Sequence, residues 1–224
     1  MNFGANILSF IEHLDFPVVL PGNVEVMIPF SAQDTRRACE LFYKKFYSDQ
    51  HSRRMIIGIN PGRFGGGVTG IPFTDPIRLQ NDCGIPNEWL KKQELSSLFV
   101  YEMIKDFGGV ADFYRNYYIT AVSPLGFTQH GKNLNYYDNK PLQDSIKPFI
   151  IDCLKKQLAF GIERKKAFCL GDGKNFKYLT KLNAEQHFFE TIVPLPHPRF
   201  IMQYRLKKKQ EYIDRYIQAL ADAN

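Results

Sequence analysis

Four short apolar runs, separated by longer amphipathic segments, constrain the fold of this chain more than any other feature of its sequence. Each run is rich in apolar or β-branched residues and is followed closely by glycine, proline or asparagine; the runs cover residues 54–59, 117–122, 167–170 and 190–195. Such runs are typical of strands that are buried on both faces. Helical patterns occupy residues 32–47, 94–107, 144–162, 173–182 and 201–221.

The alternation of these strands and helices predicts an α/β fold. Strand–helix–strand connections favour a parallel sheet with helices on both faces. We therefore expect a three-layer α/β/α architecture around a central, mostly parallel four-stranded sheet, folded as a single domain over residues 1–224. Two long irregular stretches, residues 61–87 and 123–138, interrupt the pattern, and long loops in compact domains are usually functional.

The overall charge favours a negatively charged partner. The chain has 29 Lys and Arg against 23 Asp and Glu, a formal net charge of +6, and a basic balance of this kind attracts polyanions such as nucleic acids. The N-terminus lacks the basic start and long apolar run of a signal peptide, and no stretch reaches the ~18 apolar residues of a membrane helix. We expect a cytoplasmic protein with no membrane partner.

The four cysteines, Cys39, Cys83, Cys153 and Cys169, fit no metal-ligand pattern. None has C-x-x-C spacing, and iron–sulfur clusters require closely spaced thiolates. Single cysteines within apolar segments are typical of small core residues in a reducing compartment. We expect neither a metal nor a cofactor.

Polar residues follow three of the predicted strands. Asn60 comes directly after the first strand, Ser123 after the second and His197 after the last, and each has a proline as its neighbour. Because the carboxyl ends of parallel strands meet at the same edge of a sheet, we expect these side chains to converge on one pocket. The prolines stiffen the backbone beside each polar group.

Asn60 and His197 carry the chemistry that this edge offers. The carbonyl oxygen of Asn60 can accept a hydrogen bond from a water, and the imidazole of His197 can donate one to an oxygen where negative charge develops. Neither is a strong base, and no Ser–His–Asp or paired-carboxylate spacing accompanies them. This pair suits a reaction in which the leaving group departs early and the attacking water needs only to be aimed. Each residue alone is more typical of an ordinary turn or loop, so the inference rests on the pair.

The glycine-rich loop at residues 65–70 leaves an alternative open. It formally matches the G-x-G-x-x-G pattern of dinucleotide-binding enzymes. That pattern should open a helix, yet prolines follow at positions 72 and 76, and the Gly-Lys-Ser/Thr ending of a phosphate-binding P-loop is absent. A nucleotide-cofactor-binding α/β enzyme is therefore the weaker hypothesis.

Residues 58–73 resemble the first motif of the single-strand-selective monofunctional uracil-DNA glycosylases (SMUG type). The segment reads G-I-N-P-G-R-F-G-G-G-V-T-G-I-P-F, and the family motif reads roughly G-M-N-P-G-P-F-G-x-x-x-T-G-V-P-F. His197-Pro198 resembles the start of the second motif, H-P-S-P, while residues 123–125 and 131–134 resemble the family segments C-P-L and G-R-N-L. The order and spacing fit from about residue 54 to residue 209, which is most of the chain.

The resemblance implies roles for several residues of the two motifs. Asn60 would position the water that attacks C1′ of the deoxyribose, and His197 would hydrogen-bond uracil O2 as the base leaves with its electrons. Phe73 would stack on the flipped base. Gly62 lies where other uracil-DNA glycosylases carry a bulky tyrosine that excludes 5-substituted bases, and Gly66 is expected to bind the base with it. The enzyme must extrude the nucleotide, which costs a few kcal/mol of stacking and pairing.

Two departures from the family pattern change what is expected. Ala121 stands where the family has an asparagine that reads the uracil edge, so we expect Ser123 or backbone groups to bind the base. The sequence does not decide whether the preferred substrate base is uracil or a related deaminated or oxidised base. Arg199, Phe200, Ile201 and Met202 replace the rest of the second motif. Arg199, or the apolar Phe200 and Met202, could fill the gap left by the flipped base; alternatively, Phe200 and Met202 anchor the last helix.

The lysines that follow, Lys207 and Lys208 with Lys209, are candidates for contacts to DNA phosphates. A run of three lysines is also typical of a solvated helix face. With no lysine inside either motif to form a Schiff base, the sequence predicts a monofunctional, metal-free DNA glycosylase that acts as a monomer on single- or double-stranded DNA. A non-catalytic protein that binds damaged DNA is the second alternative.

Overall fold

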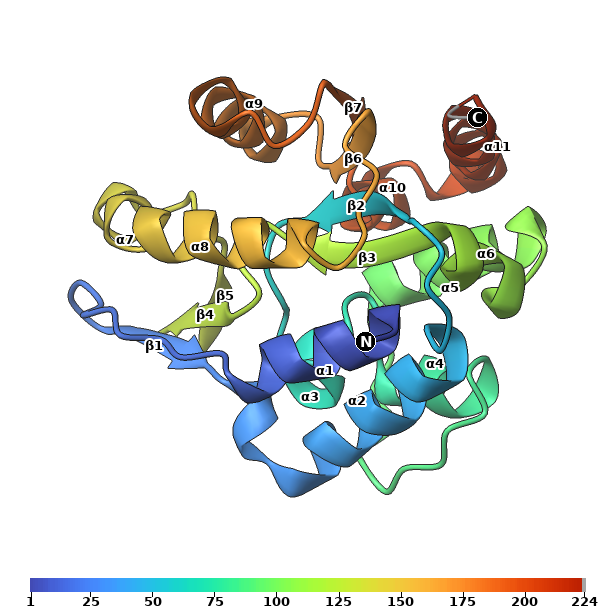
Figure 1. The fold of residues 1–224 in the computed structure, drawn as a ribbon, viewed down its shortest axis with the longest axis horizontal. Coiled ribbons are helices and arrows are strands. Elements are labelled where there is room, and N and C mark those ends of the chain that lie inside the picture. The colour runs from blue at the N-terminus through green and yellow to red at the C-terminus, as the bar shows by residue number, and fades with distance from the viewer. Residues whose placement is uncertain (223–224) are drawn as a thin grey trace.

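The computed structural model describes residues 1–222, and its centre is a parallel four-stranded sheet in the order β3-β2-β6-β7 (Figure 1). The strands are β2 (Arg54–Gly58), β3 (Tyr117–Ala121), β6 (Lys166–Leu170) and β7 (Thr191–Leu195). Each strand agrees with its predicted range to within one residue at either end. The three-layer α/β prediction is confirmed, whereas the single domain over residues 1–224 stays a prediction, and residues 223–224 lie outside the described part of the chain.

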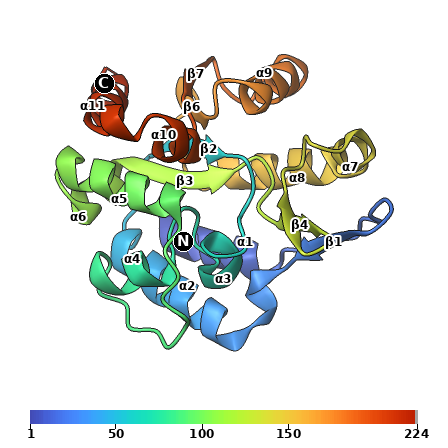
Figure 2. The ribbon, with the colours of Figure 1, turned by 180° about the vertical axis from the view of Figure 1, so that it is seen from behind.

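Helices cover both faces of this sheet. The hydroxyl of Tyr117 donates to the carbonyl of Leu220 (2.8 Å), and that of Tyr118 donates to Gln157 (3.0 Å). Since neighbouring side chains on a strand point to opposite faces, α8 (Lys147–Leu158) and α11 (Lys209–Ala221) lie on opposite sides. Helices α1 (Phe3–Glu12) and α2 (Gln33–Phe46) pack on the α8 side, and α5 (Leu95–Phe107) packs beside α11 (Figure 2).

The stretch expected to be irregular at residues 123–138 contains two strands. β4 (Gly126–Gln129) and β5 (Lys132–Leu134) form a hairpin, and β1 (Val24–Met27) pairs with β4 to make a small antiparallel sheet. The hairpin turns at His130 and Gly131, which both have positive φ (50° and 68°), as type I′ turns require. Strands of three or four residues are too short to show an alternating pattern, so the sequence did not predict them.

The other stretch expected to be irregular contains short helices, and two of the predicted helices are divided. Residues 61–87 contain α3 (Gly66–Thr69) and α4 (Pro76–Asn81). The predicted helix at 144–162 is instead α7 (Lys140–Ser145) and α8, because Pro148 at the first turn starts a new helix. The predicted tail helix is instead α10 (Pro198–Tyr204), the 3-10 turn η2 (Leu206–Lys208) and α11. The remaining elements are η1 (Pro29–Ser31), α6 (Val110–Asn116) and α9 (Lys174–Gln186). The sequence did not predict helix α1.

The structure also bears on the cysteines and on membrane-spanning helices. All four cysteines are buried with free thiols, as expected of core residues, and burial raises the pKa of each. Among the described residues, no helix combines the length and the apolar character needed to cross a bilayer.

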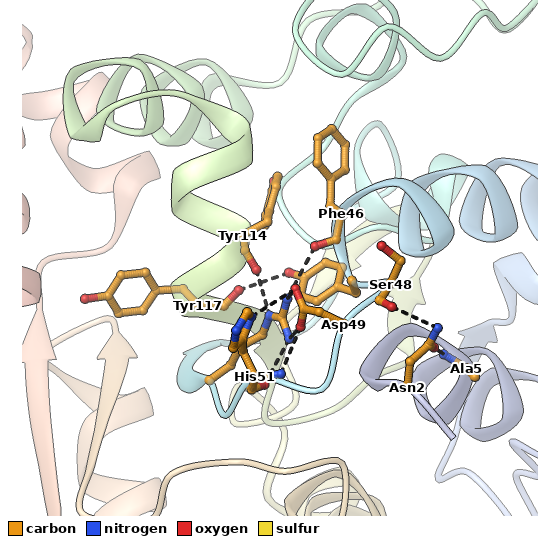
Figure 3. A network of polar contacts seen from close by, with 10 residues as sticks. Asn2, Ala5, Phe46, Ser48, Asp49, His51, Tyr114 and Tyr117 are labelled. Atoms are coloured by element: carbon orange, nitrogen blue, oxygen red, sulfur yellow. Dashed lines mark hydrogen bonds and ion pairs between the residues drawn. The ribbon is translucent and has the colours of Figure 1, made fainter.

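A fully buried arginine, Arg53, links the start of β2 to its surroundings. Figure 3 shows its hydrogen-bond partners Asp49, His51 and Tyr114. The guanidinium of Arg53 forms two parallel hydrogen bonds to the carboxylate of Asp49, at 2.9 and 3.0 Å, and Nε donates to the carbonyl of Tyr114 (2.7 Å). Its planar group also stacks over the rings of Phe3 (4.6 Å) and Tyr47 (4.7 Å). One side chain therefore joins α1, the end of α2, α6 and β2.

Replacing Arg53 by alanine should destabilise the fold by about 3 kcal/mol, toward the low end for breaking a buried ion pair because Asp49 keeps some contact with water. Chemical denaturation followed by circular dichroism measures the loss. Lys44→Ala, which removes an exposed pair with Glu40, is the matched control and should change the midpoint little. An Arg53→Ala midpoint equal to the control would contradict a structural role for the buried arginine.

Candidate active site

Two of the three polar residues predicted at the strand ends, Asn60 and His197, meet around one cavity, whereas Ser123 does not reach it. It has a volume of about 370 Å³ and lies at the carboxyl edge of the parallel sheet. Asn60 follows β2, Gly171 and Asp172 follow β6, and His197 follows β7. The lining includes Asn60, Gly62, Phe73, Glu94, Tyr137, Lys174, Asn175, His197, Arg199, Phe200 and Tyr204.

The carboxamide of Asn60 is held by the backbone that follows β5. Its Nδ2 donates to the carbonyl of Leu134 (3.2 Å), and its Oδ1 accepts from the backbone N–H of Tyr136 (3.0 Å). These two contacts fix which end of the group is oxygen. A carbonyl oxygen has two lone pairs, so one remains for a further donor in the cavity.

His197 is both a cavity residue and the N-cap of α10. Its Nδ1 accepts a hydrogen bond from the backbone N–H of Arg199 (3.1 Å). Burial and the nearby Arg199 guanidinium lower the pKa of His197 to about 4. At neutral pH the ring therefore carries its single proton on Nε2, because Nδ1 is used as an acceptor. The site thus contains a neutral hydrogen-bond donor in a fixed orientation.

Phe73 lies next to His197 in a strained backbone conformation. Its φ is +53°, which is rare for a residue with a bulky side chain, and its ring centroid is 5.9 Å from that of His197. The ring also packs against the last residue of β2: a Cβ on Gly58 would come within 2.7 Å of it. The absence of a side chain at Gly58 lets the phenyl ring lie against the sheet edge.

The glycine-rich loop uses its own backbone amides. The N–H groups of Gly65 and Gly67 donate to the carbonyl of Gly62, and those of Val68, Thr69 and Gly70 donate within the single turn α3. These amides are not free to bind a phosphate, and no long helix follows the loop. The geometry therefore gives no support to the nucleotide-cofactor hypothesis.

Of the other residues predicted to bind the base, Gly62 lines the main cavity, and Gly66 lines a smaller adjoining cavity of about 40 Å³. Ser123 lines neither cavity. Its side chain is fully buried, and its hydroxyl donates to the carbonyl of Leu125 (2.7 Å). The structure thus places Ser123 inside the turn after β3 rather than beside the space that a base would fill.

The residues predicted to contact DNA lie in two places. Arg199 and Phe200 line the cavity, and Phe200 is 40% exposed, whereas Met202 is buried in the core. Met202 therefore anchors α10, and Phe200 does not share that role. Lys207 and Lys208 lie in η2, exposed and outside the cavity, and Lys208 is 3.5 Å from Glu211.

The sequence did not point to several polar residues that line the cavity, among them Glu94, Lys174 and Asn175. The amide of the buried Asn175 is occupied, since it donates to the carbonyl of Leu170 (3.0 Å) and accepts from the hydroxyl of Tyr136 (2.8 Å). Lys174 is exposed, with Nζ 3.9 Å from the carboxylate of Asp138. Glu94 also borders the smaller cavity, where Ala121 lies. The adjacent glycines signal close approach, but nothing in the sequence signals that these distant side chains reach the same space.

Two further observations delimit the site. A larger hollow of about 880 Å³ between α1 and α8 contains none of the predicted site residues. Within residues 1–222, no group of three or more His, Cys, Asp or Glu side chains is arranged to hold a metal ion.

Comparisons with known proteins agree with this geometry. The model of the uracil DNA glycosylase superfamily matches residues 44–221. The crystal structure of wild-type Pedobacter heparinus SMUG2 superposes with a TM-score of 0.98 at 48% sequence identity, and the match covers 100% of this chain and 99% of that one. Comparison with the curated proteins gives no significant match. This chain therefore belongs to the uracil DNA glycosylase superfamily, with SMUG2 as a solved relative, and it is a DNA glycosylase of base excision repair that hydrolyses N-glycosyl bonds.

Proposed function

We propose that the chain releases uracil, or a related deaminated or oxidised base, from DNA by hydrolysis alone, with Asn60 positioning the water and His197 stabilising the leaving base. The observation that carries this proposal is the convergence of Asn60, Phe73 and His197 on one cavity. Hydrogen bonds with the backbone orient Asn60 and His197, and the ring of Phe73 packs against Gly58.

The first step is capture of the base outside the helix. Extruding a nucleotide costs a few kcal/mol of stacking and pairing, which contacts in the pocket must offset. The ring of Phe73, fixed against Gly58, offers a flat apolar face for the base. Gly62 and Gly66 leave space beside it because they have no side chains.

Bond cleavage then needs no strong base. The C1′–N bond breaks with both electrons leaving on the base, and negative charge develops on its O2 oxygen. The Nε2–H of neutral His197 donates a hydrogen bond to that oxygen. The free lone pair of Asn60 Oδ1 orients a water toward C1′; the water supplies the hydroxyl of the abasic sugar, and its proton ends on the released base or in solvent.

The face around the cavity mouth suits DNA. The rings of Phe200 and Tyr204 lie next to each other, with 5.7 Å between their centroids. The guanidinium of Arg205 lies 5.2 Å from the centroid of the Phe200 ring. Across the glycine loop, Lys92 lies 3.6 Å from the centroid of the exposed Phe64. Exposed rings beside cations stack on bases and contact phosphates together. Phe200 and Arg199 line the cavity and are our candidates to fill the gap left by the flipped base.

Several finer expectations remain predictions. They are the preferred base, the strand preference, a monomeric state and a cytoplasmic location. A non-catalytic reader of damaged DNA differs from an enzyme in one respect: it binds uracil-containing DNA without releasing the base. The same assay therefore tests both hypotheses.

Asn60→Ala should lose nearly all base release while DNA binding survives, since the variant removes the group that aims the water; the contacts to Leu134 and Tyr136 that it also removes lie within the protein. Release is measured as alkali-dependent breakage of an oligonucleotide with one uracil, and without alkali the strand should stay intact. Asn116→Ala, an exposed asparagine on α6 outside the cavity, is the matched control. Activity of Asn60→Ala within a few-fold of wild type would disprove the water-positioning role.

His197 should remain neutral well below neutral pH. Its pKa of about 4 lies below the ordinary value of 6.5, so the folded protein takes up this proton only in strong acid. Between these two values the unfolded chain binds the proton first, and the contribution of His197 to stability therefore falls as pH falls from about 6.5. An NMR titration of the imidazole measures the midpoint; a midpoint above 6 would contradict the neutral donor.

Lys207→Ala should weaken binding to all DNA sequences alike and lower the slope of log affinity against log salt by about one unit, as expected for one lost phosphate contact. Fluorescence anisotropy at several salt concentrations provides the slope. Lys44→Ala on α2 serves as the control for a surface lysine away from the cavity. An unchanged slope for Lys207→Ala would make it an ordinary solvated lysine.

A further inference from the structure

Glu94 places a carboxylate in the active-site cavity. It is the N-cap residue of α5, but its side chain does not cap that helix. Instead its backbone N–H donates to the carboxylate of Asp75 (2.9 Å), and the side chain lies over the glycine loop. A Cβ on Gly62 would lie 3.1 Å from Oε1, and a Cβ on Gly65 would overlap Oε2. The two glycines therefore make room for the carboxylate.

This carboxylate has no hydrogen-bond or ion-pair partner among residues 1–222. Glu94 is half-buried, and it lines both the main cavity and the smaller one. Withdrawing a carboxyl group from water is unfavourable unless its hydrogen bonds are replaced. An unsatisfied polar group that faces a cavity points to a ligand that would satisfy it.

The space beside Glu94 is otherwise poor in free polar side chains. The smaller cavity is lined by Glu94, Asn60, Phe73, Ala121 and several glycines and prolines. Ala121 offers no hydrogen bond, and the Asn60 amide already contacts Leu134 and Tyr136. Apart from one lone pair of Asn60 Oδ1, the side-chain hydrogen-bonding capacity that remains unused in that cavity belongs to Glu94.

We propose that Glu94 reads the hydrogen-bonding edge of the flipped pyrimidine. Its carboxyl group, when protonated, donates O–H to the O4 oxygen and accepts the N3–H of the base through its carbonyl oxygen. A protonated carboxyl group and a carboxamide present the same pair of one donor and one acceptor. This inference rests on the proposed function, because it assigns a specificity residue to the same reaction.

The charges around Glu94 support a protonated form near neutral pH. Burial and the neighbouring Asp75 raise its pKa to about 7, against a smaller opposite effect from Arg199. Asp172, Lys174 and His197 face the same cavity, and His197 is neutral there. Above pH 7 the ionised carboxylate loses its donor and repels O4. Recognition of uracil should therefore weaken as pH rises through about 7.

The test compares Glu94→Gln and Glu94→Leu with wild type in single-turnover release of uracil from pH 6 to 9. Glu94→Gln retains one donor and one acceptor, so its activity should stay within a few-fold of the wild-type value at pH 6, and its pH profile should be flat through 7. Glu94→Leu should lose about 100-fold in efficiency, the loss expected for two hydrogen bonds to a base edge. Glu88→Gln, an exposed residue outside the cavity, is the control, and circular dichroism verifies folding.

The outcomes separate this inference from the proposed function. If uracil release by Glu94→Gln is reduced as much as that by Glu94→Leu, the carboxylate itself is required, and the proposal that Glu94 recognises the base edge is overturned. If Glu94→Leu stays within threefold of wild type, Glu94 does not contact the base. Either result leaves uracil release by the wild type intact, whereas a wild type that releases no base, or an active Asn60→Ala, overturns the proposed function.

Discussion

The buried Arg53–Asp49 pair is the interaction on which the position of the site depends. A charged group fully removed from water is tolerated only when its hydrogen bonds are satisfied, and Arg53 satisfies them with Asp49 and backbone carbonyls around it. Arg53 directly precedes β2, and Asn60 follows the other end of that strand. The same arginine stacks on Phe3 of α1. One network of contacts therefore holds α1, the end of α2 and the strand that presents Asn60.

The sequence predicted the central sheet because β2, β3 and β6 are buried on both faces and so appear as uninterrupted apolar runs. The edge strand β7 is only partly buried and was predicted from its β-branched residues and the prolines that follow. It could not predict the small sheet, whose strands pair over only three or four residues and obtain their stability from tertiary contacts. The predicted boundaries of two helices were wrong for a local reason. Pro148 starts α8, and the break at Arg205 separates α10 from η2, whereas the apolar periodicity continues across both points.

The site was predictable where residues follow the strands and unpredictable where side chains reach across space. Asn60 and His197 were found because parallel strands deliver their ends to one edge. Glu94 was not, since it precedes a helix and reaches the cavity only because Gly62 and Gly65 have no side chains. Ser123 follows a strand as well, but its hydroxyl is turned inward to Leu125. Strand ends therefore predict which backbone reaches the site, and local turns decide which side chains do.

Burial acts on His197 and Glu94, two titratable groups of the cavity, in the same direction, toward the neutral form. It lowers the pKa of His197 and raises that of Glu94. The reaction explains why neutral forms of these two groups are favourable. DNA brings phosphate charges to the cavity mouth, and the leaving base becomes an anion, so a fixed carboxylate inside would oppose the reaction. A neutral carboxyl group and a neutral imidazole can instead both donate to base oxygens, and the developing negative charge then strengthens these hydrogen bonds in the transition state.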